Sequence, residues 1–260
     1  MERLDKVLAN LGYGTRKEVK ALVKSGAVEV NGALVKDSGM NIDPEKNQIK
    51  VHGEEIKYRK YIYLIMNKPE GVVSATFDNY DETVIDLLDP EYQVFNPFPV
   101  GRLDKDTVGL LLITNDGELN HKLISPKWHV DKIYYAEIDK VVNERDIKAF
   151  ESGIVLDDDY KCMPGKLQII EADGNGSKVY VTIQEGKFHQ VKRMFEALDK
   201  KVVYLKRVKF GDIDLDEALE EGEYRELTEE ELNKLKDAQC NNWKDNMNKV
   251  WIKYELFQAH

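Results

Sequence analysis

The chain has 260 residues, of which 33% are charged and 42% hydrophobic, and its formal net charge is −10. This composition excludes an intrinsically disordered chain and is typical of a soluble protein with one large and one small domain. No apolar run approaches the roughly 18 residues that cross a bilayer, and the first residues, MERLDKVLAN, lack the apolar core of a signal peptide. Cys162 and Cys240 lie far apart without a CxxC motif, so we expect a cytoplasmic protein.

The charge is unevenly distributed along the chain. Residues 1–60 hold 12 basic and 9 acidic side chains, and residues 186–211 hold 8 basic and 2 acidic ones. The acidic excess lies in residues 61–185, with a net charge of −11, and in residues 212–237, with −9. Because charges are screened beyond about 8 Å in physiological salt, the basic segments can still bind a polyanion.

The first sixty residues predict two helices and a hairpin. Apolar residues at positions 4, 7, 8 and 11 predict an amphipathic helix over residues 2–11. Thr15 and Glu18 form the pattern of a capping box, which predicts a second helix that ends near Gly26. Asn31-Gly32 lies between two alternating segments and predicts a tight hairpin, and a short strand is expected at residues 48–51. We expect the domain boundary near residue 60.

The second predicted helix carries basic residues, with Lys17, Lys20 and Lys24 on one side and Arg16 beside them. From charge alone, a solvated helix face explains this pattern better than a binding surface.

The remaining chain mixes strands and helices. Strands are predicted at residues 61–66, 110–113, 133–139 and 177–185, and residues 208–215 read as a strand that continues into a turn. A capped helix is predicted over residues 143–153, and a helix with a buried stripe follows Gly186. The elements show no regular βαβ order, so we expect an α+β domain with a largely antiparallel sheet.

Two acids and an arginine stand at the entrance of the predicted strand 110–113. They are Arg102, Asp104 and Asp106 in the segment VGRLDKDTVG. By pattern alone, carboxylates at this place are more often loop caps than catalytic groups, and we expect at most one of the two to face any given pocket.

Lys192 and Arg193 lie near the start of a predicted helix. Cations are disfavoured there unless they face an anion, which could be a phosphate or a carboxylate such as Asp104. His189 beside them is more often structural than catalytic.

No metal or cofactor is expected. Asp212, Asp214, Asp216 and Glu223 have the spacing of a calcium loop, but Glu217 stands where that loop needs glycine. Residues 157–159 read as an acidic surface turn, and neither a zinc cluster nor a glycine-rich phosphate loop is present.

Longer motifs carry a resemblance to known proteins. The order helix, TRKEVKALVKSG helix and VEVNG hairpin resembles the S4 RNA-binding domain, which implies that Arg3, Arg16, Lys17 and Lys20 face RNA phosphates. NKPEGVVSAT, PVGRLDKDTVGLLLITNDGELNHKL, KIYYAEI and EGKFHQVKRMFEAL resemble the successive motifs of the RsuA-type pseudouridine synthases over residues 1–235. The resemblance implies an S4 domain with linker at 1–60 and a catalytic domain at 61–235, with a largely antiparallel mixed sheet flanked by helices.

The resemblance also implies a reaction and its residues. Asp104 would be the nucleophile, Tyr134 would stack on the flipped-out uridine, and Lys192, or alternatively Arg193, would pair with Asp104. Arg102 would enter the RNA beside the extruded nucleotide, and Leu205 and Lys206 would border the pocket.

The implied substrate is ribosomal RNA. The HQVKRM version of the last motif resembles the 16S rRNA enzyme, so we expect a monomer that acts, without metal or cofactor and away from membranes, on 16S rRNA in a small-subunit assembly particle. The alternatives are a 23S rRNA enzyme of the same family, a non-catalytic S4 assembly factor, and a metal-dependent hydrolase. Residues 236–260 match no family motif, and Trp243, Met247, Val250 and Trp251 suit a short amphipathic helix.

Overall fold

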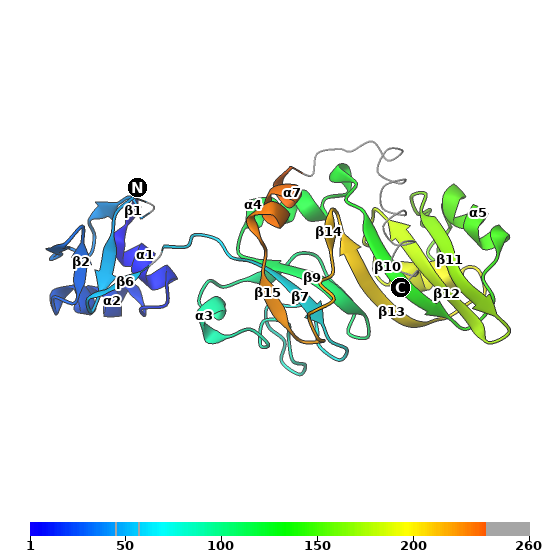
Figure 1. The fold of residues 1–260 in the computed structure, drawn as a ribbon, viewed down its shortest axis with the longest axis horizontal. Helices are drawn as coiled ribbons and strands as arrows, with labels where there is room; N and C mark the ends of the chain where they lie inside the picture. The colour runs from blue at the N-terminus through cyan, green and yellow to red at the C-terminus, as the bar shows by residue number, and fades with distance from the viewer. Residues whose placement is uncertain (45, 57, 238–260) are drawn as a thin grey trace. The chain divides into compact units, whose positions relative to one another are not determined.

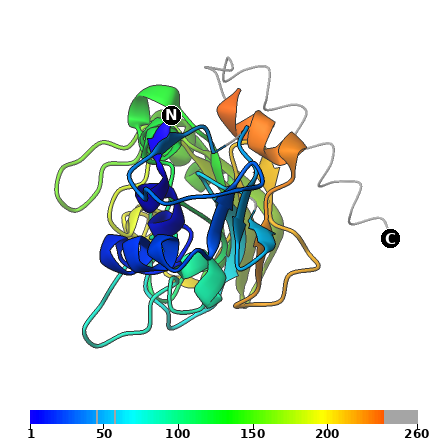
Figure 2. The same cartoon turned by 90° about the vertical axis from the view of Figure 1, so that its left-hand side faces the viewer.

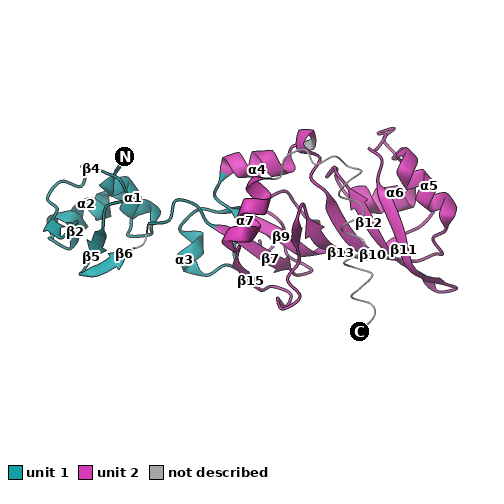
Figure 3. Cartoon of the chain, turned by 45° about the horizontal axis from the view of Figure 1, so that its top comes forward, with its two compact units in different colours: residues 1–62, 85–98, 114–116 teal, residues 63–84, 99–113, 117–260 magenta. Residues whose placement is uncertain are grey.

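The fold was analysed in a computed structural model, which describes residues 1–44, 46–56 and 58–237. The amphipathic pattern of Trp243, Met247, Val250 and Trp251 lies outside these residues. The chain divides into two units, which Figure 3 colours separately. One comprises residues 1–62, 85–98 and 114–116, and the other residues 63–84, 99–113 and 117–260.

Two helices begin the first unit, and both form where the sequence predicts them. Helix α1 (Leu4–Asn10) starts two residues later than expected, because β1 (Glu2–Arg3) pairs with β4 (Asn41–Ile42). Helix α2 (Arg16–Lys24) has the predicted capping box: the Thr15 hydroxyl accepts from the Glu18 amide at 3.3 Å, and the Glu18 carboxylate accepts from the Thr15 amide at 2.6 Å. The first four backbone amides of a helix have no acceptor within the helix. The capping box supplies acceptors for two amides at the start of α2.

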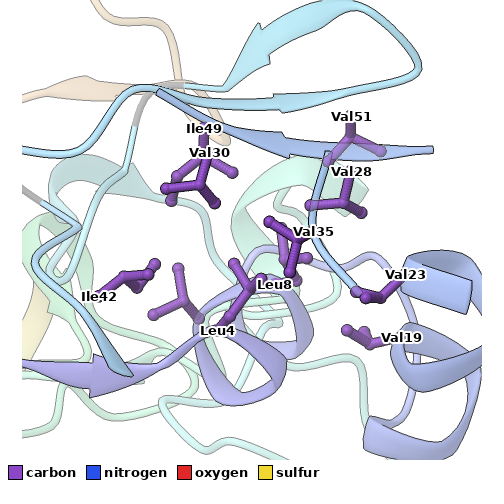
Figure 4. Close-up of a cluster of buried hydrophobic side chains, with 11 residues drawn as sticks. Leu4, Leu8, Val19, Val23, Val28, Val30, Val35, Ile42, Ile49 and Val51 are labelled. Carbon is purple, nitrogen blue, oxygen red and sulfur yellow. The ribbon is translucent and has the colours of Figure 1, made fainter. Parts of the chain in front are cut away.

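A four-stranded antiparallel sheet completes the N-terminal domain. Its order is β3 (Ala33–Leu34), β2 (Val28–Val30), β5 (Ile49–Val51) and β6 (Glu54–Ile56). The predicted turn joins β2 and β3, with φ of 51° at Asn31 and 78° at Gly32, as a two-residue hairpin requires. Figure 2 shows α1 and α2 beside the sheet. Figure 4 shows the buried aliphatic cluster between these helices and the sheet, which includes Leu4, Leu8 and Val19.

The second unit is built on a long mixed sheet (Figure 1). Its order is β11 (Lys166–Asp173), β12 (Gly176–Ile183), β10 (Lys132–Ile138), β13 (Val202–Phe210), β9 (Val108–Thr114), β7 (Tyr63–Lys68) and β15 (Tyr224–Glu226). The pairs β11–β12, β12–β10, β10–β13 and β7–β15 are antiparallel, whereas β13 and β9 run parallel. The α+β class expected from the sequence is confirmed. β8 (Phe98–Pro99) pairs with β9 at its edge.

Helices cover parts of this sheet. Helix α5 (Glu144–Ser152) packs against β11, and α6 (Gln190–Glu196) packs against β13. Helix α5 is capped as expected, and its cap at Asn143 is a capping box; the helix ends at Gly153. The remaining short elements are α3 (Pro90–Gln93), α4 (Gly117–Ile124), the 3₁₀ helix η1 (Pro126–Trp128) and α7 (Glu229–Lys236). No helix among the described residues has the length and apolarity that a membrane crossing requires.

The strand predicted over residues 208–215 is wrong in its course. The chain reverses at Gly211, and β14 (Ile213–Asp214) pairs back onto the end of β13. Phe210 and Ile213 both enter the core although they lie three residues apart, so the turn shifts the two-residue alternation by one position. The apolar residues keep a two-residue spacing on each side of the turn, which is why the segment reads as one longer strand.

Candidate active site

A central buried strand carries the segment that holds Asp104. All seven residues of β9 are buried, and the loop of residues 101–107 leads directly into it. Gly109 is the point of closest approach to β13: it has φ of 98°, and a Cβ there would lie 2.4 Å from the Arg207 carbonyl oxygen. Glycine is therefore required for β9 and β13 to pair, and this pairing brings the Asp104 loop beside β13.

The loop is held by the segment that follows β7. The Ser74 hydroxyl donates to the Leu103 carbonyl at 2.9 Å and accepts from the Leu103 amide at 3.1 Å. The Lys68 ammonium is fully buried and donates to the carbonyls of Pro69, Thr107 and Lys105 at 2.9, 3.0 and 3.4 Å. Burial lowers the pKa of Lys68 to about 8, although the charges of Asp106 and Asp104 oppose the shift. Residues 68–74 therefore support the Asp104 loop through these hydrogen bonds.

Lys192 of helix α6 binds both carboxylates of the loop. Its Nζ lies 3.1 Å from Asp104 Oδ2 and 2.5 Å from Asp106 Oδ1, and only 16% of its side chain is exposed. Burial alone would lower the pKa of Lys192, but the hydrogen bonds to Asp106 and Asp104 outweigh it and raise the pKa. Burial raises the pKa of Asp106, and the stronger effect of Lys192 brings it below its usual value. The site thus holds a permanently protonated lysine between two acids.

As expected, only Asp104 of the two acids is among the residues that line the neighbouring pocket, although Lys192 binds both carboxylates. Asp104 and Asp106 lie on the same side of the chain, since Lys192 hydrogen-bonds both. Residues 104–107 form a turn, which the Thr107 amide closes by donating to the Asp104 carbonyl at 3.1 Å. Asp104 is the more enclosed acid, with 26% of its side chain exposed against 63% for Asp106.

Arg193 is placed elsewhere. Its guanidinium forms ion pairs with Asp157 and, at 2.8 Å, with Asp158. These hydrogen bonds raise the pKa of Arg193 further. Adjacent helical residues point about 100° apart, so only one of the two cations can reach Asp104. The turn of residues 157–159, expected to be solvated, is therefore attached to helix α6.

Tyr134 and Asp104 line one pocket. Tyr134 is 93% buried in β10 and reaches the pocket from the sheet. Leu205 of β13 also lines it, together with Arg102, Thr107 and His189. The described lining includes Leu205 but not Lys206, because successive strand residues point to opposite faces of the sheet. Arg102 is exposed at the pocket.

His189 is closer to Asp104 than the sequence suggests. Its Nε2 lies 3.6 Å from Asp104 Oδ1, and its φ of 49° is a left-handed conformation at the first position before α6. In the sequence, His189 simply precedes a predicted helix, and this place does not predict a contact with Asp104. A histidine three residues before the lysine of the same helix start is the one hint that the pattern offers.

A buried carboxylate fixes the start of helix α6. Glu185 accepts hydrogen bonds from the Tyr160 hydroxyl, from the Met163 amide at 2.8 Å and from Gln190 Nε2 at 3.0 Å. The bond to Glu185 raises the pKa of Tyr160 to about 12. Sequence reasoning missed Glu185 because its partners lie up to 25 residues away, across a loop. Since α6 carries Lys192, this network positions the cation of the site.

Arg207 is a second residue that sequence reasoning missed. It is 2% exposed, its Nε donates to the Leu110 carbonyl at 2.7 Å, and it stands opposite Tyr134 in the β10–β13 register. Burial lowers the pKa of Arg207, and the Tyr134 hydroxyl beside it partly restores it. Among the described residues, Arg207 Nη2 and the Thr107 hydroxyl are buried without a hydrogen-bond partner. Of these two residues, Thr107 lines the pocket.

The predicted phosphate-binding residues of the N-terminal domain differ in whether their charge is already paired. Arg16, Lys17 and Lys20 are exposed on helix α2. Arg3 instead forms a two-pronged ion pair with Asp5, at 2.7 and 3.1 Å. The positive charge of Arg3 is therefore already neutralised within the domain.

Two of the four acids in the rejected calcium pattern are ion-paired. Asp214 binds Lys209 at 2.7 Å, and Asp216 binds Arg225 at 2.6 Å. Within residues 1–44, 46–56 and 58–237, no group of three or more metal-binding side chains gathers.

Comparison with known proteins identifies both domains. Residues 62–197 match the RNA pseudouridylate synthase family, and residues 2–47 match the S4 domain. A Bacillus subtilis protein named as an uncharacterized RNA pseudouridine synthase is 53% identical over 92% of this chain and 100% of its own length. The ribosomal small subunit pseudouridine synthase A of Vibrio cholerae is 41% identical over 88% of this chain and 97% of its own. The ribosomal large subunit pseudouridine synthase B of Bacillus subtilis is 38% identical, with coverages of 91% and 96%.

A solved structure agrees with these sequence matches. A crystal structure of a pseudouridylate synthase has a TM-score of 0.63 and 39% identity, and the match covers 90% of this chain and 100% of that one. The family match contains Asp104 and Tyr134, which line the pocket, and Lys192, which is bound to Asp104. The chain therefore belongs to the RNA pseudouridylate synthase family, as an isomerase that acts on RNA and carries an S4 domain before its catalytic domain.

Proposed function

We propose that this enzyme converts one uridine of 16S ribosomal RNA to pseudouridine, with Asp104 as the nucleophile. The observation that carries the proposal is the lysine-bound carboxylate at a pocket lined by Tyr134: Lys192 Nζ lies 3.1 Å from Asp104 Oδ2. A carboxylate held beside a protonated lysine is ionised and oriented, which a nucleophile or a base requires.

The isomerisation breaks the N1–C1′ glycosidic bond of uridine and forms a C5–C1′ bond. C5 loses a proton and N1 gains one, so the reaction consumes no energy source. Asp104 starts it either by adding to an electrophilic carbon or by taking a proton from the sugar. The residues of the pocket bind, orient and protect the detached base while it turns.

Three further residues have roles in this proposal. Tyr134 stacks on the flipped-out base, and its buried position in β10 fixes its ring. Lys192 hydrogen-bonds Asp104 and orients its carboxylate, with Asp106 as the second anchor of the lysine. Arg102, exposed at the pocket, enters the RNA beside the extruded nucleotide and so offsets part of the unstacking cost of a few kcal/mol.

The small-subunit substrate is supported by the HQVKRM motif and by the similarity to small-subunit synthases. The exposed basic residues of α2 supply phosphate contacts that do not depend on sequence. The acidic segments 61–185 and 212–237 oppose unspecific RNA binding, which favours a partly assembled small-subunit particle over naked RNA. A cytoplasmic, monomeric enzyme is part of this proposal.

The test is to map pseudouridine in rRNA from cells with and without the gene, and then to restore the site with purified protein. We expect one 16S position to disappear and to return with the wild type, but not with Asp104→Asn, which should still bind RNA. Asp106→Asn is the matched control and should retain part of the activity, because Lys192 keeps Asp104 as a partner.

Two results would contradict the proposal. Wild-type turnover by Asp104→Asn would remove the catalytic assignment. A missing pseudouridine in 23S rRNA would instead favour the large-subunit reaction, which the 38% identity to a large-subunit synthase keeps as the second candidate. Equal rates on naked 16S rRNA and on small-subunit particles would contradict the particle preference alone.

A further inference from the structure

An exposed aromatic side chain stands at the edge of the Asp104 pocket. Phe188 is 76% exposed, although phenylalanine is among the residues most often buried. Its ring stacks on that of His189, with centroids 3.8 Å apart and planes inclined by 17°. One ring face of Phe188 is thus covered by His189, while most of the side chain remains open to solvent.

His189 connects this ring to the reacting site. His189 lines the pocket, and its Nε2 lies 3.6 Å from Asp104 Oδ1. His189 thus contacts both Phe188 and Asp104 and lies between them. A base that stacks on Phe188 would therefore belong to a nucleotide next to the one whose sugar lies at Asp104.

The surrounding structure fixes Phe188 in this exposed place. The turn of residues 187–190 is closed by the Gln190 side chain, whose Oε1 accepts from the Lys187 amide at 2.9 Å. Gln190 is 3% exposed and is itself bound to the buried Glu185. His189 has a left-handed φ of 49°, which non-glycine residues keep only where their surroundings determine it. An aromatic ring on a fixed turn loses little freedom when a ligand stacks on it.

The charges nearby suit a polyanion. Residues 186–211 have a net charge of +6, and Arg102 opens onto the same pocket. A ring with an open face beside basic groups is the arrangement by which proteins hold unpaired bases of single-stranded RNA.

We propose that Phe188, backed by His189, stacks on an unpaired base adjacent to the target uridine. The inference rests on the proposed function and narrows its substrate class to a uridine with an unpaired neighbour. It makes Phe188 a residue that binds and selects RNA, not one that takes part in bond breaking.

The experiment measures binding of an RNA fragment that contains the mapped uridine. The fragment is prepared intact and with an abasic nucleotide on either side of the uridine. The proteins are the full chain, Phe188→Ala, Phe188→Trp and the control Val203→Ala, which removes another exposed hydrophobic side chain, 66% exposed on β13. Thermal unfolding of each variant checks that the fold is unchanged.

We expect Phe188→Ala to bind the intact fragment roughly 5- to 100-fold more weakly, the effect of losing one base stack. Phe188→Trp and Val203→Ala should bind like the wild type. One of the abasic fragments should weaken the wild type by a similar factor but should weaken Phe188→Ala no further. Single-turnover pseudouridine formation at saturating RNA should change little in Phe188→Ala.

Equal affinity of Phe188→Ala and the wild type would overturn the inference, as would additive losses from Phe188→Ala and both abasic fragments. In either case an active wild type would leave the proposed function in place. A wild type that forms no pseudouridine in any rRNA would overturn the proposed function, and this inference with it.

Discussion

The basic residues of helix α2 and those of helix α6 are used in different ways. Lys17, Lys20 and Lys24 are exposed along one side of α2, and none of them has an ion pair among the described residues. On α6, Lys192 and Arg193 are 16% and 15% exposed, and each binds two carboxylates. The first set offers mobile charges to a polyanion, whereas the second fixes single charges at defined atoms.

The difference teaches how RNA affinity and chemistry are separated in one chain. Exposed lysines bind phosphates through long-range attraction, so their individual positions matter little. A cation that supports a nucleophile must stand within hydrogen-bond reach of it, which requires burial, anchors and a partner from another element. Substitutions should therefore have graded effects in α2 and a large effect at Lys192 of α6.

The largest expected effect is that of Lys192→Met. It removes the cation 3.1 Å from Asp104, so we expect the rate of pseudouridine formation to fall by roughly 10²- to 10⁴-fold while RNA still binds. Single-turnover assays at saturating RNA measure the rate. Arg193→Met is the matched control and should lose far less, because its partners Asp157 and Asp158 lie on another loop. A greater loss in Arg193→Met would reverse our assignment of the two cations.

Next in size is the effect of Lys68→Met on stability. Three carbonyl oxygens would lose their common donor, and we expect the free energy of unfolding to fall by about 2–4 kcal/mol. Urea denaturation gives this value. Lys105→Met, which breaks only the exposed ion pair with Asp81, should cost less than about 1 kcal/mol. Equal losses of stability in the two variants would mean that Lys68 does not hold the Asp104 loop.

A smaller effect concerns pH. The pKa of Lys68 is about 8 in the folded protein and near 10.5 when unfolded, so the unfolded chain binds more protons between these values. The stability of the wild type relative to Lys68→Met should therefore rise by roughly 1–2 kcal/mol from pH 8 to pH 9.5. Urea titrations of both proteins across this range measure the difference. A constant difference would show that Lys68 titrates normally.

The smallest change per residue is expected in α2. Replacing Lys17, Lys20 and Lys24 by glutamine should weaken rRNA binding roughly 10-fold and reduce the slope of log affinity against log salt by about 2. The turnover rate at saturating RNA should stay unchanged. The same replacement of Lys140, Lys178 and Lys201, which are exposed in the larger unit, serves as control. Loss of turnover in the α2 variant would break the separation between affinity and chemistry.

Local signals made several elements predictable. The capping boxes at Thr15 and Asn143 and the Asn31-Gly32 turn form between neighbours in the chain, and each appears where the sequence predicts it. The buried strand after Asp104 was predictable because its apolar run is continuous. The reversal at Gly211 was not, since apolar spacing is the same on both sides of the turn.

By itself, the sequence determined the residue types of the site, the elements that carry them and the family to which they belong. The tertiary structure alone decided that Lys192, 88 residues from Asp104, is its partner, and that Asp106 shares this lysine. It also brought the Lys68 ammonium into hydrogen-bond contact with the Asp104 loop, and Glu185 into contact with Gln190 at the start of helix α6. Local conformation follows from adjacent residues, whereas these contacts depend on the order of the strands and on a glycine that lets β9 approach β13.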